Sequence, residues 1–473
     1  MHPLLIGDQR PAGSGRITVL EPALGAPMDE VASAAEADVN AAVSTAKNAF
    51  PHWSGMTAVA RADLIFRFSD LVRSRAEELA TLEARNVGKP IGDARWEANH
   101  VADTLRYYAG AADKFFGETI PVSKGGLDIT LRDALGVVSL IVPWNFPMVI
   151  ATWKLGPALA CGNTVVLKPA SLTPLTALRL GELALEAGIP PGVVNVIPGP
   201  GAKVGAQLAA HPDVAKIGFT GETATGRAIL QASAQTMKRV SLELGGKSPN
   251  VIFGDVDVAL AARHAVDAVF ANAGQDCCAR SRVIVERSIY PALVEAMAAA
   301  AESMKLGDPL DPATEMGPLV SAAQRDRTEE YVQVGKSEGA RLVCGGARPG
   351  RDGFFLSPAI FADARPRMRI VDEEIFGPVV TVMPFDTEEE AITLANDSIY
   401  GLSGSLWTND LKRGLRVARA IRTGVLSVNS SSSVHLQAPF GGYRQSGLGR
   451  ELGMHAMDHY SEVKNIYFET AAL

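Results

Sequence analysis

Short apolar runs alternate with amphipathic stretches along most of the chain from about residue 137 onward. Near-continuous apolar runs are typical of parallel strands whose two faces are both covered by helices. A first set of such runs consists of residues 136–142, 163–168, 193–197 and 216–219, with helical stretches at 174–187 and 201–210. A second set consists of Val251 and residues 283–285, 341–343, 379–382 and 424–428. The pattern therefore predicts an α/β fold with two doubly wound parallel-sheet domains.

Three further stretches lie outside these two sets. Residues 40–115 have the apolar spacing of long helices. Residues 116–134 alternate loosely between apolar and polar positions, and residues 460–473 include the apolar triplet Ile466-Tyr467-Phe468. Strand-like ends of this kind often pair with a partner chain. The alternative is that both stretches cover their own domain.

Composition places the chain among ordinary globular proteins. It has 473 residues, enough for about three domains, with 47% hydrophobic and 21% charged residues. The net charge of −7 gives no basic surface for nucleic acid. The N-terminus lacks the pattern of a signal peptide, and the most apolar run, Leu135 to Trp144, is about half the length of a membrane helix. We therefore expect a cytoplasmic protein without nucleic-acid or membrane partners.

The four cysteines indicate the redox state of the cellular compartment, and one of them is a candidate nucleophile. Their number and spacing fit neither a disulfide framework nor a zinc site, so no metal is expected and a reducing compartment is indicated. Cys161 and Cys344 are expected in the core. Cys277 follows the sequence Asn272-Ala273-Gly274-Gln275-Asp276, and its neighbour is Cys278.

Two other segments offer groups that would complement the Cys277 thiol. Glu243 lies in the glycine-rich segment 241–250, 34 residues (277 − 243) before the thiol, and Asn145 lies between the two prolines of segment 143–147. A nucleophile, a base and an oxyanion donor are the parts needed for covalent chemistry at a carbonyl carbon. The three segments together are therefore candidates for one catalytic site.

Taken together, these motifs resemble the aldehyde dehydrogenase superfamily, and the likeness extends from about residue 5 to Lys464. The resemblance implies that Cys277 forms a thiohemiacetal, which gives up hydride to NAD(P) and becomes a thioester. Glu243 would activate the water that hydrolyses the thioester, and the Asn145 amide would stabilise the oxyanion. The presence of Glu243 favours water over coenzyme A as the acyl acceptor, and so a free carboxylic acid as product.

The expected dinucleotide site lacks a Gly-x-Gly-x-x-Gly motif. Segment 219–227 instead follows a short strand and opens a helix, so that its N–H groups can face a pyrophosphate. The loop 199–205 alone is weak evidence, because a simple turn explains it equally well. The resemblance implies a cofactor site made of Val142, Trp144, Lys168, Ser171, Gly201, Gly221, Glu222, Leu244, Glu374 and Phe376.

Two of these positions bear on cofactor choice. Relatives commonly have Ser at the position of Glu222, whose carboxylate would repel a phosphate, so we expect this side chain to point to solvent or to a cation. Relatives that prefer NAD often have Glu at the position of Ser171. Serine beside Lys168 can accept a 2′-phosphate, so NADP is plausible and use of both cofactors is expected.

The resemblance also implies a substrate pocket and a proton relay. The pocket residues are Phe146, Trp153, Asp276, Cys278, Val434 and Phe440, with the serine-rich loop 430–435 beside them. Asp276 either raises the pKa of the neighbouring thiol and receives a polar or cationic substrate, or is turned away from it. Asn99-His100, at the place of an acidic pair in betaine- and aminoaldehyde-oxidising relatives, disfavours a cationic aldehyde. Lys154 and Glu451 would carry a proton from Glu243, unless they form only a surface ion pair.

The family fold implies how the chain divides. Residues 1–115 and 135–246 would form a cofactor-binding domain, and residues 247–445 a catalytic domain. Residues 116–134 and 446–473 would supply an oligomerisation arm and the C-terminal segment of a homodimer or homotetramer. The partner molecule is then a small aldehyde, whose identity the sequence leaves open.

Two other functional classes compete with this interpretation. A thiol hydrolase would need no cofactor, which would leave segments 219–226 and 374–378 without a purpose. A non-catalytic binding protein is disfavoured because all three catalytic side chains are intact.

Overall fold

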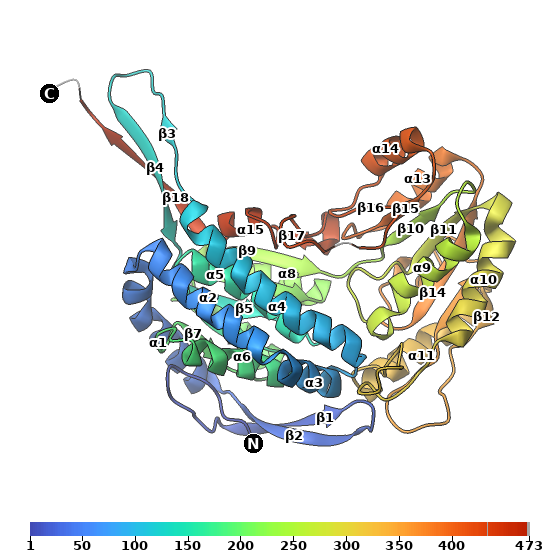
Figure 1. Ribbon diagram of the computed structural model, residues 1–473, viewed down its shortest axis with the longest axis horizontal. Coiled ribbons are helices and arrows are strands. Elements are labelled where there is room, and N and C mark those ends of the chain that lie inside the picture. Colours follow the sequence, from blue (N-terminus) through green and yellow to red (C-terminus); the bar gives the residue numbers. More distant parts are fainter. Residues whose placement is uncertain (433, 471–473) are drawn as a thin grey trace.

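The computed structural model describes residues 1–432 and 434–470. Within them the chain forms two bodies of sheet and helix, and a thin arm projects from one of them (Figure 1). The two principal sheets have six and seven strands, and the sheet of the arm has three. The α/β class predicted from the apolar runs is thus confirmed.

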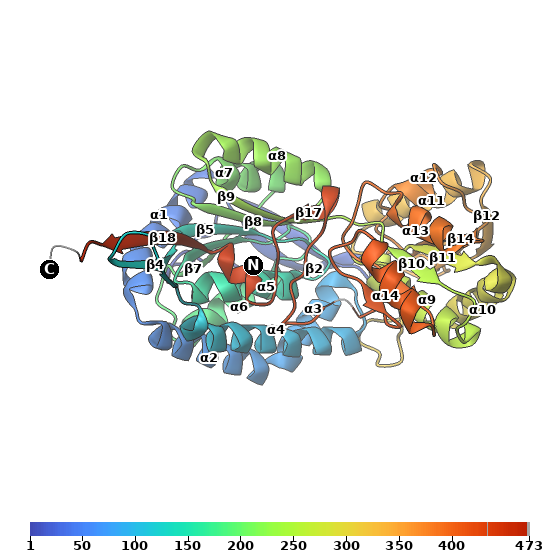
Figure 2. The same ribbon diagram turned by 90° about the horizontal axis from the view of Figure 1, so that it is seen from above.

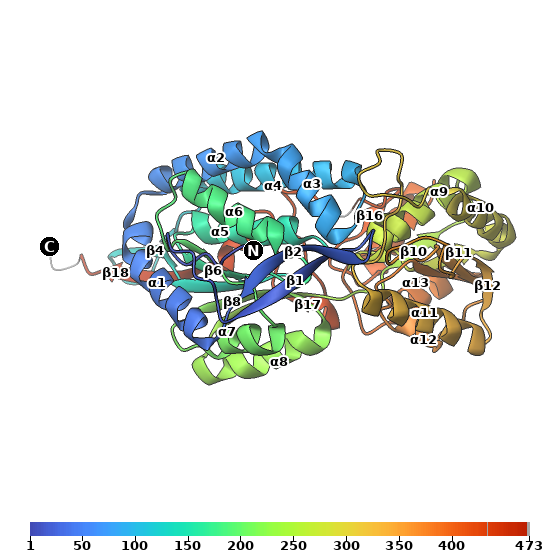
Figure 3. The ribbon, with the colours of Figure 1, turned by 90° about the horizontal axis from the view of Figure 1, so that it is seen from below.

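The first part of the chain is a hairpin followed by helices. Its elements are β1 (Gly15–Glu21), β2 (Ala26–Ser33), α1 (Glu36–Gly55), α2 (Ala58–Ser74), α3 (Ala76–Val87), α4 (Ile91–Ala111) and η1 (Ala112–Lys114). The helices predicted for residues 40–115 are confirmed. The hairpin, which crosses the underside of the molecule in Figure 3, was not predicted. It buries few side chains, among them Val19 and Val31, so its apolar alternation is weak.

The six-stranded sheet has the order β17-β9-β8-β5-β6-β7, and only the edge strand β17 is antiparallel. Its strands are β5 (Val137–Ile141), β6 (Thr164–Lys168), β7 (Val194–Val196), β8 (Lys216–Gly221), β9 (Arg239–Leu244) and β17 (Gly447–Leu448). The helices between them are α5 (Pro147–Ala160), α6 (Leu175–Glu186), η2 (Gly201–Gly205), α7 (Ala206–Ala210), α8 (Thr223–Ser233) and η3 (Ala234–Thr236). Helices α7 and α8 cover one face with α1, whereas α5 and α6 cover the other face and lie between the sheet and α2–α4 (Figure 2).

The seven-stranded sheet has the order β12-β13-β14-β11-β10-β15-β16, with an antiparallel strand only at the β12 edge. Its strands are β10 (Pro249–Ile252), β11 (Arg282–Glu286), β12 (Arg341–Cys344), β13 (Ala359–Ala362), β14 (Val379–Phe385), β15 (Ser405–Trp407) and β16 (Ser427–Val428). The helices around it are α9 (Val258–Phe270), η4 (Ala271–Gly274), η5 (Arg287–Ile289), α10 (Tyr290–Ser303), α11 (Ala322–Ser337), α12 (Arg369–Asp372), α13 (Glu388–Asn396) and α14 (Leu411–Ala420). β13 and β15 in this sheet, and β9 and β17 in the six-stranded sheet, were not predicted.

The arm consists of β3 (Thr119–Ile120), β4 (Leu127–Ala134) and β18 (Ser461–Phe468) in the order β18-β4-β3. It extends away from the six-stranded body, and the C-terminal strand forms one of its edges (Figure 1). Residues 471–473 of the predicted C-terminal segment lie outside the described residues.

The part of the C-terminal segment before the arm returns to the six-stranded body. η6 (Arg444–Ser446) leads into β17, whose Gly447 pairs with Glu243 of β9. After α15 (His455–Asp458), Tyr460 is buried in the same apolar cluster as α5. The segment predicted as 446–473 therefore contributes first to the sheet that carries Glu243, and only from Ser461 to the arm.

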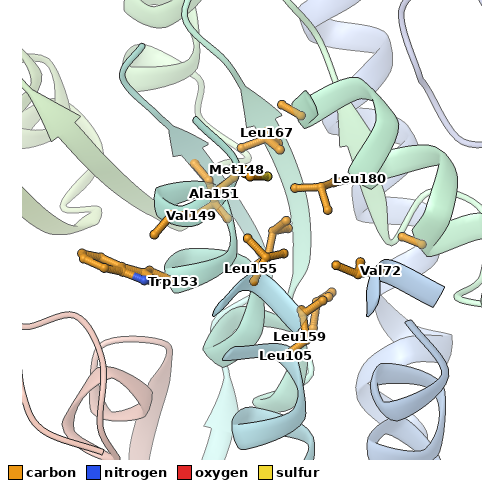
Figure 4. Close-up of a cluster of buried hydrophobic side chains, with 14 of the residues drawn as sticks. Val72, Leu105, Met148, Val149, Ala151, Trp153, Leu155, Leu159, Leu167 and Leu180 are labelled. Carbon is orange, nitrogen blue, oxygen red and sulfur yellow. The ribbon is translucent and has the colours of Figure 1, made fainter. Parts of the chain in front are cut away.

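Helix α5 lies at the centre of the largest apolar cluster. Each of its fourteen residues is buried, and Figure 4 shows Met148, Leu155 and Leu159 facing side chains of α2, α4 and β6. Although α5 is strongly apolar, no helix in the described part of the chain has both the length and the apolarity to cross a membrane. The buried position of α5 fixes the turn at its N-terminus, which carries the candidate oxyanion donor.

Candidate active site

Three loops at strand and helix ends bring the candidate catalytic residues together. Asn145 lies in the turn between β5 and α5, Glu243 lies near the end of β9, and Cys277 follows η4. All three line one cavity of about 430 Å³, and Cys277 also lines a second cavity of about 320 Å³. The thiol therefore lies where the two cavities meet.

The Asn145 side chain is buried and tied to the loop that carries Cys277. Its Nδ2 donates to the backbone carbonyl of Gln275 at 3.0 Å, and Asn272 Nδ2 donates to the Asn145 carbonyl at 3.1 Å. One N–H of the Asn145 amide remains for another acceptor, because an amide nitrogen carries two. The donor and the nucleophile are thus held in one hydrogen-bonded unit.

The Cys277 loop has an unusual backbone. Asn272, Ala273 and Gly274 all have positive φ (49°, 55° and 72°). A Cβ on Gly274 would lie 2.2 Å from the Gly377 carbonyl oxygen, so only glycine fits there. Gln275 closes the loop by accepting from the Val320 N–H at 2.9 Å. The segment just before the nucleophile is therefore fixed by contacts with Gly377 and Val320.

The thiol is surrounded by other acidic groups. A hydrogen bond with Cys278 has the largest effect in raising the pKa of Cys277 above its usual range, followed by burial and by the carboxylates of Glu243 and Asp276. Asp276 is not turned away: its carboxylate accepts from the Cys278 N–H at 2.8 Å and lines the second cavity with both thiols. Cys344 is buried as expected, and Cys161 is half-buried.

Glu243 has the properties of a poised base. Its side chain is 2% exposed, and Oε1 has no hydrogen-bond partner among the described residues. Burial raises its pKa to about 8, whereas the Lys154 ammonium and a hydrogen bond with the Cys277 thiol lower it. Lys154 Nζ in turn donates to Glu451 Oε1 at 2.5 Å, and both of these side chains are buried. Lys154 and Glu451 are therefore an interior pair, not a surface ion pair.

The first cavity contains part of the predicted cofactor site. The predicted residues that line it are Trp144, Gly221, Glu222, Leu244, Glu374 and Phe376. The Trp144 and Phe376 rings meet edge-on with centroids 5.2 Å apart, and Glu374 Oε1 accepts from the Gly246 N–H at 2.9 Å. Glu222 is exposed at the N-cap of α8, as expected for a side chain that points to solvent.

The remaining predicted cofactor residues lie outside this lining. They are Val142, Lys168, Ser171 and Gly201. Lys168 Nζ donates to the Pro169 carbonyl at 2.9 Å, and Ser171 Oγ donates to the Gly199 carbonyl at 3.1 Å. Burial lowers the pKa of Lys168 to about 8.

The first cavity also has lining residues that the sequence did not reveal. They are Gln324, Arg327, Tyr331, Glu373, Ile399 and Tyr400. They come from α11 and from loops of the seven-stranded body, where no local motif marks them.

The second cavity contains every predicted pocket residue that was named individually. Its lining includes Phe146, Trp153, Asp276, Cys278, Val434 and Phe440. Ser431 and Ser432 of the serine-rich loop also line it, whereas Ser433 lies outside the described residues. His100 does not line this cavity, but it contacts two residues that do. It accepts a hydrogen bond from Trp153 Nε1 at 3.2 Å, and its ring stacks on Trp96.

A buried cation beside Asn145 was also missed. Lys89 Nζ donates to the Asn145 carbonyl at 2.9 Å and to Glu97 Oε1 at 2.6 Å, and it lies 4.3 Å from the Phe146 ring centroid. Glu83 lies 3.9 Å away, and all three charged side chains are buried. A lone lysine in a helical region carries no sequence signal for such a contact.

The chain is similar to known proteins over nearly its whole length. Residues 10–466 match the model of the aldehyde dehydrogenase family. The chain is 43% identical to betaine aldehyde dehydrogenase of Bacillus subtilis, over 93% of this chain and 92% of that protein. It is 45% identical to retinal dehydrogenase 2 of Mus musculus, over 96% and 89% respectively.

Solved structures show the same likeness in three dimensions. The NAD⁺ complex of an aldehyde dehydrogenase from Bacillus cereus superposes with a TM-score of 0.98 and 44% identity, covering 99% of this chain and 96% of that one. The site geometry, the family model and these relatives agree, and the chain belongs to the aldehyde dehydrogenase family.

Proposed function

We propose that the protein oxidises an aldehyde to a carboxylic acid with NAD, through a covalent adduct on Cys277. The observation that carries this proposal is the position of the Cys277 thiol between two cavities, beside Glu243 and the Asn145 amide. One cavity has the features of a dinucleotide site and the other is lined largely by apolar and aromatic side chains. A relative with 44% identity has been solved with NAD⁺.

The residues of the first cavity fit a nicotinamide cofactor. The N-terminus of α8 presents backbone N–H groups at Thr223 and Ala224, which line this cavity and suit a pyrophosphate. Glu374 offers a carboxylate for ribose hydroxyls, and Trp144 and Phe376 offer an apolar wall for a ring. When bound, the nicotinamide would accept the hydride that the thiohemiacetal loses.

In the proposed mechanism the chain supplies the nucleophile, the oxyanion donors and the base. The Cys277 thiol loses its proton to water in the cavity, and its sulfur adds to the aldehyde carbon. The free N–H of the Asn145 amide and the Cys277 backbone N–H stabilise the oxyanion, at about 2.7–4 kcal/mol for one donor. Glu243 then takes a proton from the water that hydrolyses the thioester, and the buried Lys154–Glu451 pair passes that proton on. No metal takes part.

The choice between NAD and NADP depends on the residues beside Lys168. Ser171 places no carboxylate beside Lys168, so nothing there repels a 2′-phosphate, and we propose that both NAD and NADP are used. The Ser171→Glu variant should lose most of its activity with NADP and keep its activity with NAD. An equal loss with both cofactors would contradict this assignment.

Substrate identity does not follow from the relatives. Two relatives of nearly equal identity are named for betaine aldehyde, a cation, and for retinal, a long apolar aldehyde. The test is therefore the initial rate of reduced-nicotinamide formation with aliphatic, aromatic, amino and polyene aldehydes, each with NAD and with NADP. Turnover with at least one combination of aldehyde and cofactor supports the proposal. Cys277→Ser should abolish this turnover while cofactor binding persists, and a variant that kept its rate would overturn the mechanism.

We propose the following organisation for the rest of the molecule. Residues 1–115 and 135–246 form the cofactor-binding domain and residues 247–445 the catalytic domain. The arm, made from 116–134 and the end of the 446–473 segment, pairs protomers in a homodimer or homotetramer. Its exposed apolar side chains support this, as does the position of its edge strand. Four free thiols, one of them the nucleophile, suit a reducing compartment such as the cytoplasm.

A further inference from the structure

Asp276, Cys277 and Cys278 form a compact group of metal-ligating atoms in the wall of the second cavity. One carboxylate oxygen and the two Sγ atoms all lie within 4.8 Å of one another. Within residues 1–432 and 434–470, no other group of three His, Cys, Asp or Glu side chains comes this close. All three line the second cavity, so a solute that reaches the nucleophile meets the whole group. The role proposed above uses only Cys277.

Two buried cations, Arg280 and Lys89, line the same cavity as the group, and each has hydrogen-bond acceptors of its own. The guanidinium of Arg280 donates to the Cys278 carbonyl and to Ser405 Oγ. The Lys89 ammonium is engaged with Glu97 and the Asn145 carbonyl. A divalent cation among these ligands would supply the positive charge that two thiolates and a carboxylate need.

We propose that Asp276, Cys277 and Cys278 form a reversible inhibitory site for a thiophilic divalent cation of the Zn²⁺ and Cd²⁺ type. Zinc binds cysteine sulfur at about 2.3 Å and aspartate oxygen at about 2.0–2.2 Å, and three protein ligands plus one water complete its tetrahedron. Two thiol protons leave to solvent as two metal–sulfur bonds and one metal–oxygen bond form, with no change of oxidation state. The bound cation occupies the sulfur that must attack the aldehyde.

The inference goes beyond the proposed dehydrogenase activity and gives Asp276 and Cys278 a role. A cation held only by Cys277 would bind as to any accessible thiol, whereas three ligands act as a chelate. Losing one ligand should therefore weaken binding by at least about tenfold. The distinction can be tested because Cys278 and Asp276 have near-isosteric replacements in Ser and Asn.

The experiment titrates Zn²⁺ and Cd²⁺ into the purified full-length enzyme during turnover at saturating NAD and varied aldehyde. We expect complete inhibition that is competitive with aldehyde, reversed by a chelator and accompanied by one bound metal per chain. The inhibition constant should rise at least about tenfold in Cys278→Ser and in Asp276→Asn, each measured against its own uninhibited rate. Cys344→Ser, which removes a thiol outside the cavity, serves as the matched control with an unchanged inhibition constant.

A spectroscopic measurement keeps the test decisive if a variant loses its basal activity. Cd²⁺ bound by two thiolates has an ultraviolet sulfur-to-metal band, which should fall by about half in Cys278→Ser and in Cys277→Ser and disappear in the variant that lacks both thiols. Equal inhibition of wild type and both ligand variants would overturn the proposal in favour of attack on a single thiol. Metal binding without inhibition would mean an adventitious surface site and would also overturn it. Activity in chelated buffer tests the dehydrogenase function separately.

Discussion

The Glu243 carboxylate lies in an interior that opposes its ionisation. Burial raises its pKa to about 8, and the nearby Lys154 ammonium brings it only part of the way back. A general base acts in its deprotonated form. The pH at which the site works is therefore set by the environment of this one side chain as much as by the thiol.

We predict that the rate of thioester hydrolysis rises with pH through about 8, because Glu243 loses its proton over that range. Glu243→Gln should lower kcat by about 10²–10⁴-fold and keep the initial burst of reduced nicotinamide. Stopped-flow absorbance and a kcat–pH profile measure both effects. A variant with an unchanged burst-to-steady-state ratio would show that another group activates the water.

Lys89 shows how a single buried cation can position a catalytic group. Its ammonium donates to the backbone carbonyl of Asn145 and to Glu97, while Phe146 covers it. Removing one partner of a buried ion pair costs about 3–5 kcal/mol, because the other charge is left unpaired. Stability and activity can therefore be separated at this position.

For Lys89→Met we predict a lower melting temperature and a kcat that falls by about tenfold or more, because the Asn145 carbonyl loses one of its two hydrogen-bond donors. The double variant Lys89→Met/Glu97→Gln should recover part of that stability, since only the more distant Glu83 carboxylate is then left without its cation, but it should not recover kcat. NAD affinity serves as the control and should stay constant in both. Full recovery of kcat in the double variant would mean that Lys89 contributes only to stability.

At the scale of elements, the site is made by turns at strand ends that face each other between two sheets. The turn after β9 packs against the segment that carries Glu374, which precedes β14 in the other sheet. Gly245 permits this contact, because a Cβ there would lie 2.2 Å from Glu374 Oε2. The glycine pair in the motif thus serves the packing of two sheets.

We predict that Gly245→Ala displaces Glu374 and raises the KM for NAD by about tenfold, a loss of roughly 1.4 kcal/mol in binding. The matched control is Gly55→Ala at the end of α1, where a new Cβ would meet nothing within 4 Å. Initial rates at varied NAD measure the effect. An unchanged KM in Gly245→Ala would show that Glu374 does not hold the cofactor.

At the scale of the whole molecule, the arm exposes apolar side chains on both of its faces. β4 and β18 pair along eight residues, and Leu131 and Val463 remain exposed there. Val463 pairs with Arg132, so Leu131 and Val463 lie on opposite faces of the arm. Exposed apolar side chains on both faces fit an arm that lies between protomers.

We predict that Leu131→Lys and Val463→Lys shift the protein toward monomers, because a buried charge opposes association. Light scattering coupled to size-exclusion chromatography measures the mass. Leu260→Lys, at an exposed leucine on α9, is the control and should leave the mass unchanged. Arm variants with the wild-type mass would place the oligomer interface elsewhere.

Strands β9, β13, β15 and β17 were not predicted. The sequence by itself determined the other strands of the two principal sheets, the leading helices and the motifs that contain Asn145, Glu243 and Cys277. Each of these is a local property. A buried strand needs a continuous apolar run, and the turns around the three side chains need glycine or proline at fixed positions. Gly274 is an example, since its positive φ and its contact with Gly377 exclude other residues.

Only the tertiary structure decided which distant residues complete the site. Lys89, Trp96 and Glu97 lie before or on α4 and meet Asn145 and the second cavity because α4 packs on α5. It also decided that Asp276 faces the thiol and that Lys154 and Glu451 are buried together. The physical reason is that side-chain direction and burial follow from packing between elements far apart in the chain, which no short motif encodes.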